Sequence, residues 1–163
     1  SYELTIPFDL SVTGGETTIA LGNGKRLKVK IPAGVSTDST LRLKGQGSVG
    51  ANGRAGDALI KIKVQDSPVF TREGDNVSVT VPITLKEAVL GGKIPVPTPS
   101  GVVMMTIPAY SGGNKTLRLK GKGVKGKGDL LVSLQVVLPE KPDTALTEFM
   151  QSWNEPYQNL KRG

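Results

Sequence analysis

Apolar and polar residues alternate along most of the chain with a period of two. Leu4, Ile6 and Phe8 alternate with Thr5 and Pro7. The same alternation occurs in the segments 27–31, 41–44 and 60–64, where the polar positions are mostly lysine and arginine. This pattern is typical of strands that have one face on a hydrophobic core and the other face in water. The sequence therefore predicts many short strands.

The alternating segments occur twice in the same order, with a period of about 70 to 80 residues. LTIPFDL (4–10) matches VTVPITL (79–85), Gly14-Gly15 matches Gly91-Gly92, KVKIPAG (28–34) matches MTIPAY (105–110), LRLKG occurs at 41–45 and 117–121, and Gly56-Asp57 matches Gly128-Asp129. We therefore expect a mainly β fold, with two tandem small β-sandwich domains of the same fold, short helices and a C-terminal helix. Each sandwich is expected to be mainly antiparallel. The expected domains are 1–72, 73–141 and, for the C-terminal helix and tail, 142–163.

Two glycine motifs of the form G-x-G-x-x-G follow the LRLK segments. They comprise Gly45, Gly47 and Gly50 in the first copy, and Gly121, Gly123 and Gly126 in the second. A dinucleotide fingerprint needs a helix directly after the glycines, because the helix N-terminus holds the phosphates. Here another alternating strand follows. The glycines are therefore interpreted as hairpin-loop residues, with Gly47, Gly50 and Gly53 supplying positive φ.

Two segments have a helical pattern instead. In LKEAVLGG (85–92), Leu85, Ala88 and Val89 share a face and the glycines end the helix. In the last segment, four apolar residues recur at helical spacing, with Asp143 or Thr144 as the N-cap and Pro156 as a stop: Leu146, Phe149, Met150 and Trp153. Two alternatives remain for this apolar stripe, which could pack back on the second sandwich or contact a partner subunit.

Composition excludes several kinds of chemistry. The chain of 163 residues contains no cysteine and no histidine, which removes disulfides, cysteine-based zinc sites and the histidine-dependent catalytic triads. No apolar run is long enough to span a membrane, and the start of the chain has no signal-peptide pattern. The net charge of +7 is compatible with nucleic acid, an acidic surface or simple solubility.

The ordered blocks resemble the C-terminal half of DnaJ-type (J-domain) co-chaperones. The resemblance covers nearly the whole chain, and its most specific parts are FTREGD (70–75) and the LGG of 90–92. The family's J-domain carries a His-Pro-Asp motif, so a chain without histidine lacks that domain. Only GNGKR separates Leu21 from Leu27, which leaves no room for the zinc module of some members. The sequence thus resembles the zinc-free class, and within it the bacterial curved-DNA-binding (CbpA-like) branch.

The resemblance implies that unfolded client polypeptides add as a strand in an apolar groove of the first sandwich. The family's groove positions fall on Leu4, Ile6, Ile19, Leu21 and Phe70. Without the resemblance, these five residues would be interpreted as ordinary core. The resemblance further implies a homodimer through the C-terminal helix, delivery of clients to a DnaK-type ATPase through the missing J-domain, no cofactor, and a cytoplasmic location that could extend to the nucleoid.

Two rival functions remain. Nucleic-acid binding is suggested by four lysines in one glycine-rich segment, which could follow phosphates without reading sequence: Lys120, Lys122, Lys125 and Lys127. An enzyme would need a catalytic pair, for which Asp57 and Asp129 are the candidates. Because these two residues are equivalent in the repeat, we expect them in separate domains and predict no catalysis.

Overall fold

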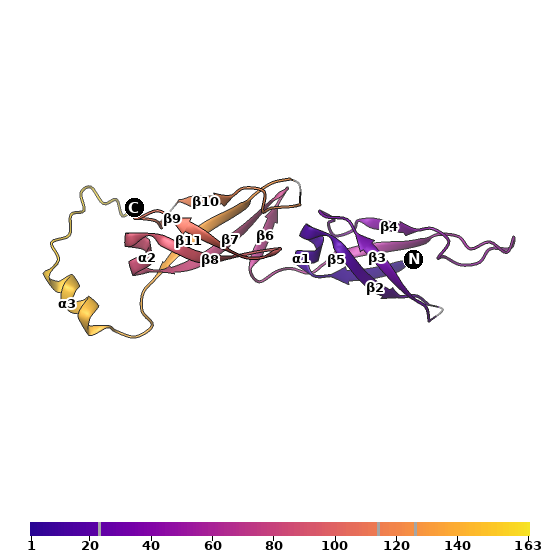
Figure 1. Cartoon of the computed structure of the whole chain (residues 1–163), viewed down its shortest axis with the longest axis horizontal. Coiled ribbons are helices and arrows are strands. Elements are labelled where there is room, and N and C mark those ends of the chain that lie inside the picture. The colour runs from indigo at the N-terminus through magenta and orange to yellow at the C-terminus, as the bar shows by residue number, and fades with distance from the viewer. Residues whose placement is uncertain (23, 114, 126) are drawn as a thin grey trace.

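The computed structural model describes residues 1–22, 24–113, 115–125 and 127–163. Two β-rich lobes lie end to end along the long axis, and a C-terminal helix lies beyond the second lobe (Figure 1). The first lobe is built from β1 (Tyr2–Ile6), α1 (Phe8–Thr13), β2 (Gly15–Ala20), β3 (Arg26–Ile31), β4 (Thr40–Leu43) and β5 (Ala58–Val64). The second is built from β6 (Phe70–Glu73), β7 (Asn76–Thr84), α2 (Leu85–Leu90), β8 (Gly92–Thr98), β9 (Gly101–Ile107), β10 (Thr116–Leu119) and β11 (Leu130–Val137). The C-terminal helix is α3 (Thr144–Ser152).

Each lobe is a small sandwich of two sheets. In the first lobe the three-stranded sheet β1-β5-β4 faces the hairpin β2-β3, and in the second the four-stranded sheet β10-β11-β7-β6 faces the hairpin β8-β9. Antiparallel pairs predominate among the described strands, but each lobe also contains one parallel pair, β1-β5 or β7-β11. The mainly β fold with two tandem sandwiches and a C-terminal helix is confirmed.

The strand alternation places the apolar residues where the sequence predicts them. Ile60 and Ile62 of β5 are fully buried in the first lobe, and Val77 and Leu130 are fully buried in the second. The intervening residues, such as Lys61, point to solvent. The four-stranded sheet of the second lobe already begins at Phe70, because β6 pairs with β7. The domain limits 1–72 and 73–141 stay a prediction.

The repeat is confirmed, but one of its segments is shifted relative to the sequence match. Both lobes have a helix that starts after an extended N-cap, Pro7 or Thr84, and ends at a glycine with φ near +72°, Gly14 (φ 73°) or Gly91 (φ 72°). Pro7 is therefore equivalent to Thr84, so the alignment of LTIPFDL with VTVPITL is wrong by two residues. Since strand side chains alternate with a period of two, a two-residue slip leaves every apolar residue on the same face.

The described residues of the two G-x-G-x-x-G segments lie in the loops between β4 and β5 and between β10 and β11, and the next described element is a strand in each case, as predicted. Gly53 has the expected positive φ of 75°, whereas the interpretation of Gly47 and Gly50 was wrong, because neither has positive φ. At position 47 glycine is required for a steric reason instead, since a Cβ atom there would lie 2.4 Å from the carbonyl oxygen of Asp57. Gly126 lies outside the described residues.

The helices begin where their capping residues predict. Thr84 and Glu87 form a capping box at α2, in which each side chain accepts a hydrogen bond from the other residue's amide, at 3.0 and 2.9 Å. Asp143 caps α3 by accepting from the amide of Leu146 at 2.9 Å. α3 ends at Ser152, ahead of the predicted stop at Pro156. Within the described part of the chain, no helix is long and apolar enough to cross a membrane.

Candidate functional site

Four of the five expected groove residues lie together in the first lobe. Leu4 and Ile6 of β1, Ile19 of β2 and the adjacent Leu21 belong to one hydrophobic cluster. Ile6, Ile19 and Leu21 are buried, whereas Leu4 is half-buried. Leu4 is thus the member of this set most accessible to a partner, and the other three are buried in the cluster against which it packs.

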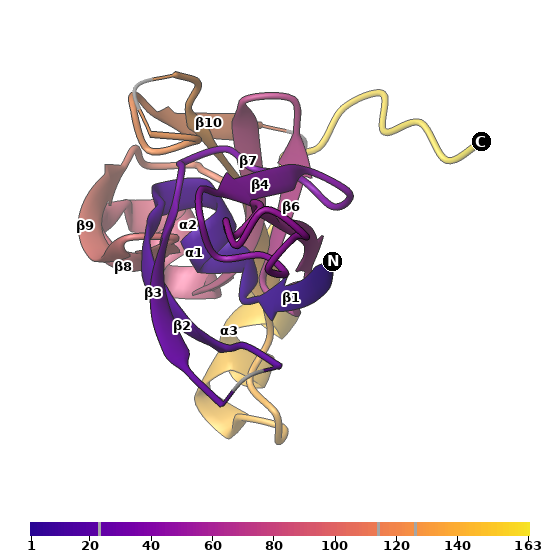
Figure 2. The same cartoon turned by 90° about the vertical axis from the view of Figure 1, so that its right-hand side faces the viewer.

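Two open strand edges flank this cluster. Among the described strands, β1 pairs only with β5 and β2 pairs only with β3. The amide of Gly22, just after β2, donates to the hydroxyl of Tyr2 on β1 at 3.2 Å. The start of β1 therefore lies within reach of the end of β2; Figure 2 looks along the molecule onto the first lobe, with both strands labelled. An open edge offers unpaired N–H and C=O groups to an incoming strand.

The backbone donors of β2 alternate between its partner strand and its open edge. The amide of Leu21 bonds to the carbonyl of Lys25 at 2.8 Å, on the side of β3. In an antiparallel pair successive residues alternate in direction, so the amides of Thr18 and Ala20 face away from β3. They are the donors that an added strand would use.

Phe70, the fifth expected residue, lies elsewhere. It is buried in the hydrophobic cluster of the second lobe and its ring stacks on Phe8 with centroids 6.1 Å apart. With Phe8, Val35 and Val64 it lines a pocket of about 540 Å³ between the lobes. The structure therefore does not place Phe70 in the same cluster as the other four residues.

In the second lobe, prolines obstruct the edge that matches β2, whereas β6 reaches the edge that matches β1 only at its first residue, because Val79 is equivalent to Tyr2. β6 pairs with the first half of β7, from Asn76 to Val79. β8 carries Pro95 and Pro97, which have no N–H to donate. These prolines are equivalent to Thr18 and Ala20, since Gly92 pairs with Ile107 as Gly15 pairs with Ile31. The sequence shows the prolines, but only the strand register reveals which edge they block.

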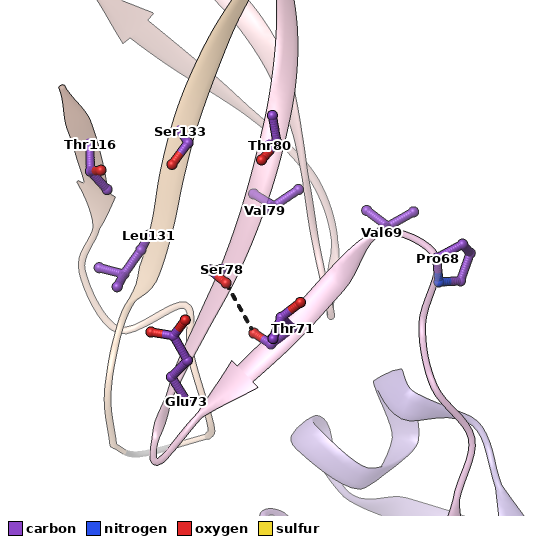
Figure 3. Close-up of a pocket in the computed structure, with 10 residues that line it drawn as sticks. All are labelled: Pro68, Val69, Thr71, Glu73, Ser78, Val79, Thr80, Thr116, Leu131 and Ser133. Carbon is purple, nitrogen blue, oxygen red and sulfur yellow. Dashed lines mark hydrogen bonds between the residues drawn. The ribbon is translucent and has the colours of Figure 1, made fainter. Parts of the chain in front are cut away.

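The outer face of the four-stranded sheet in the second lobe is shallow and rich in hydroxyl groups. A hollow of about 540 Å³ lies on this face. Figure 3 shows the residues that line it, with Thr80 and Thr116 on either side of Ser133 on neighbouring strands. Ser78 donates to the carbonyl of Thr71 at 3.4 Å, and Glu73 is the one carboxylate of the lining. In the described residues no group of three or more acidic side chains is arranged to hold a metal ion. This hollow brings no general acid and base together.

Asp57 and Asp129, which are rejected as a catalytic pair from the sequence, lie in different lobes and make equivalent contacts. Asp57 accepts from the amide of Gly45 at 3.0 Å, and Asp129 accepts from the amide of Gly121 at 2.8 Å. Each also pairs with an arginine of the preceding strand, Asp57 with Arg42 at 2.6 Å in the first case. The glycine amide, and then the arginine, lower the pKa of each carboxyl below its usual value. Each carboxylate therefore holds the two ends of one glycine-rich loop together, between β4 and β5 or between β10 and β11.

The apolar stripe of α3 faces a groove at the end of the second lobe. Phe149, Met150 and Trp153 are 60%, 41% and 41% exposed, and Leu146 is half-buried. The rings of Phe149 and Trp153 stack with centroids 6.4 Å apart. Across a groove of about 1090 Å³ lie Val89, Leu90, Tyr110 and Leu138. The helix holds no buried residue, so this chain alone leaves the stripe largely in water.

The four expected nucleic-acid-binding lysines are all exposed in the segment that joins β10 to β11. Lys120 and Lys122 flank Gly121, and Lys125 and Lys127 flank the undescribed Gly126. Their side chains form a cationic loop. Such a loop contacts phosphates without selecting a base sequence.

The comparisons with known proteins establish the family. Residues 1–139 match the model of the DnaJ C terminal domain. The chain is 40% identical over 160 residues to a curved DNA-binding protein of Serratia proteamaculans, covering 96% of this chain and 52% of that protein. It is 41% identical over 146 residues to a curved DNA-binding protein of Escherichia coli, covering 87% of this chain and 48% of that protein. It is also 39% identical over 139 residues to chaperone protein DnaJ 2 of Corynebacterium glutamicum, covering 83% of this chain and 35% of that protein.

The chain belongs to the DnaJ C-terminal domain family. Its likeness to the curved DNA-binding proteins extends over nearly its whole length, as the resemblance of the sequence indicates. The chain spans about half the length of these relatives, and about a third of DnaJ 2. The names of these relatives denote a chaperone and a DNA-binding protein, not an enzyme.

Proposed function

We propose that this chain is the client-binding and dimerisation part of a zinc-free DnaJ-type co-chaperone. An extended, apolar segment of an unfolded polypeptide adds to the first lobe along the open edge of β2. The observation that carries the proposal is a difference between the lobes at one edge: the outward edge of β2 keeps its amides, whereas Pro95 and Pro97 remove the matching amides from β8. An open edge is normally an aggregation hazard, so its selective retention supports a use for it.

The added strand would be held by backbone hydrogen bonds and by apolar contacts. Thr18 and Ala20 supply outward amides, and half-buried Tyr2 and Leu4 of β1 pack against the apolar cluster of the first lobe. Burial of one or two client leucine or phenylalanine side chains contributes about 1.5–3 kcal/mol each. Ordering of an extended peptide offsets part of this gain. The binding is therefore weak and tolerant of sequence, as a chaperone requires.

A proline substitution tests the edge directly. Ala20→Pro removes one outward amide and copies the arrangement that Pro97 already has in the second lobe, so the fold tolerates it. Fluorescence anisotropy of a labelled leucine- and phenylalanine-rich peptide should show binding weakened about tenfold, or about 1.4 kcal/mol. Ala20→Ser, which keeps the amide, is the matched control and should bind like the unchanged chain. Equal binding by Ala20→Pro and Ala20→Ser would refute strand addition at β2.

The proposal includes a dimer formed through α3. The stripe of Phe149, Met150 and Trp153 is too exposed to be explained by contacts within one chain, and the groove beside it is lined by further exposed apolar residues. A second copy that covers both would remove this surface from water. In the whole protein, we infer that the clients pass to a DnaK-type ATPase through a J-domain, in the cytoplasm.

Nucleic-acid binding is the second candidate function. The observations that favour it are the cationic loop and the printed name of the relatives from Serratia proteamaculans and Escherichia coli. Replacing Lys120, Lys122, Lys125 and Lys127 by glutamine should lower duplex affinity and make it less dependent on salt, because each lost phosphate contact reduces the salt slope by about 0.9. Peptide binding should be unchanged. If the four substitutions leave the duplex affinity unchanged, the loop between β10 and β11 is not part of a DNA interface.

A further inference from the structure

Arg72 connects the two lobes through main-chain carbonyl groups. Its Nη1 donates to the carbonyl oxygens of Gly34 at 2.9 Å and Val35 at 3.1 Å, both in the first lobe. Its Nε donates at 2.7 Å to the carbonyl of Gly74, in the turn between β6 and β7. A guanidinium is planar and carries several donors in fixed directions. One side chain therefore holds backbone groups of both lobes at once.

A valine beside Arg72 completes the contact. Val124 belongs to the loop between β10 and β11, yet it is only 3% exposed. Its Cγ1 lies 3.1 Å from the position that a Cβ atom on Gly34 would occupy. Val12, on α1 of the first lobe, is fully buried in the hydrophobic cluster of the second lobe. The amide of Lys125 also donates to the carbonyl of Val12, at 3.5 Å.

Comparison of the two copies shows that Val12 and Gly34 are covered by contact with the second lobe and not by the fold of the first lobe itself. Val89 occupies in the second lobe the place that Val12 occupies in the first, and Tyr110 occupies the place of Gly34. Val89 is 39% exposed and Tyr110 is 80% exposed. The same end of the same fold is thus open when no further lobe follows it.

We propose that Arg72 and Val124 fix the angle between the two sandwiches, so that they move as one rigid arm, with Arg72 as the residue that sets the orientation. Motion between domains is the ordinary expectation when an interface is small and polar. Here a buried valine and a two-carbonyl clamp oppose that motion. Where this concerns clients, it rests on the proposed function: a rigid arm keeps the open edge of β2 in a constant orientation relative to the second lobe.

Distance measurements between two spin labels test the rigid arm. Because the chain has no cysteine, Lys28→Cys on β3 and Lys93→Cys on β8 give one label on each lobe. The unchanged protein should give a single narrow distance distribution. Arg72→Ala and Arg72→Lys should widen it about twofold or more, since an ammonium lacks the planar donor fork of arginine. Arg42→Ala, which removes the equivalent ion pair with Asp57 inside the first lobe, is the control and should leave the distribution narrow.

A distribution that stays narrow in Arg72→Ala, and in the double variant Arg72→Ala with Val124→Ala, would overturn the proposal. Circular dichroism shows whether each variant is folded, and Arg72→Gln provides a milder second variant if Arg72→Ala unfolds. Peptide anisotropy separates this proposal from the proposed function. Arg72→Ala should bind a single-segment peptide as well as the unchanged chain does. Absence of peptide binding by the unchanged chain would refute client binding and leave the distance result standing.

Discussion

The hydroxyl of Tyr2 accepts a hydrogen bond from the amide of Gly22 at 3.2 Å, which ties the start of β1 to the end of β2. Each of these two strands has one edge that pairs with no other described strand. The bond crosses from one sheet of the sandwich to the other. It therefore helps to set the spacing of the proposed client groove.

We expect Tyr2→Phe to loosen this end of the groove without unfolding the lobe. The bond is exposed to water, so its loss should cost about 0.5 kcal/mol in the free energy of unfolding, measured in urea. Hydrogen exchange of the Gly22 amide should become faster. Tyr157→Phe, in the exposed C-terminal tail, is the control for removal of a tyrosine hydroxyl. Unchanged exchange at Gly22 would show that the bond does not protect that amide.

Restoring donors to β8 should create a second open edge. In the double substitution Pro95→Thr with Pro97→Ala, the second lobe receives the residues that the first lobe has at Thr18 and Ala20. We expect more self-association at high concentration, and a second, weak peptide-binding event, because unpaired strand amides recruit other strands. Light scattering and peptide titration would measure both. Lys93→Thr, on the same strand without a new amide, should change neither.

Because of the aspartate at the base of each loop, we expect the free energy of unfolding to depend on pH in the acidic range. The folded-state pKa of Asp129 is lowered, chiefly by the amide of Gly121 and then by Arg118. A group with a lowered folded pKa contributes stability that is complete above its unfolded pKa and is lost as the pH falls through the folded value. The loss attributable to Asp129 should therefore begin as the pH falls below about 4.

Asp129→Asn should flatten the acid limb of the stability curve in that range, because asparagine carries no charge to be neutralised. Urea unfolding from pH 6 to pH 2 measures the slope. Glu155→Gln, in the exposed tail, should keep the slope of the unchanged chain. An unaltered slope in Asp129→Asn would mean that the loop contacts do not persist in solution.

The stripe on α3 predicts the oligomeric state. Trp153→Ser should weaken a dimer by at least about tenfold in Kd, because it removes a large apolar ring from the proposed interface. Sedimentation equilibrium measures the constant. Gln151→Ala, an exposed residue of the same helix, should leave it unchanged. If the unchanged chain sediments as a monomer at all accessible concentrations, the dimer proposal fails for this chain.

Much of this fold follows from period-two alternation and from the repeat. Ile60 and Ile62 could be assigned to a core, and Asp57 and Asp129 to separate lobes, from the sequence alone. The same alternation could not fix the alignment of the two copies, since a slip of two residues keeps all faces in place. The equivalence of Pro7 and Thr84 became visible only through helix caps and strand register.

The candidate site was less predictable, because it depends on which strand edges have no neighbouring strand, and this follows only from the strand pairing. Leu4, Ile6, Ile19 and Leu21 could be grouped by resemblance, and they do share a cluster. The position of Phe70 could not be predicted in the same way, because its segment joins the second sheet and its ring meets Phe8 at the junction. No sequence pattern signalled the clamp by Arg72, whose partners are main-chain carbonyls.

The prolines of β8 also affect how the two halves of the repeat tolerate change. After a duplication, both halves begin with the same freedom to vary. The β8-β9 hairpin forms with Pro95 and Pro97 in place, so a proline at Thr18 or Ala20 should preserve folding and, under the proposed function, block strand addition. Random substitution screens should thus give asymmetric outcomes at matched positions, with losses of activity at Thr18 and Ala20 that leave yield intact. Under the proposed function, transferring the two prolines of β8 to the matching positions of β2 would therefore give a folded variant that cannot add a client strand.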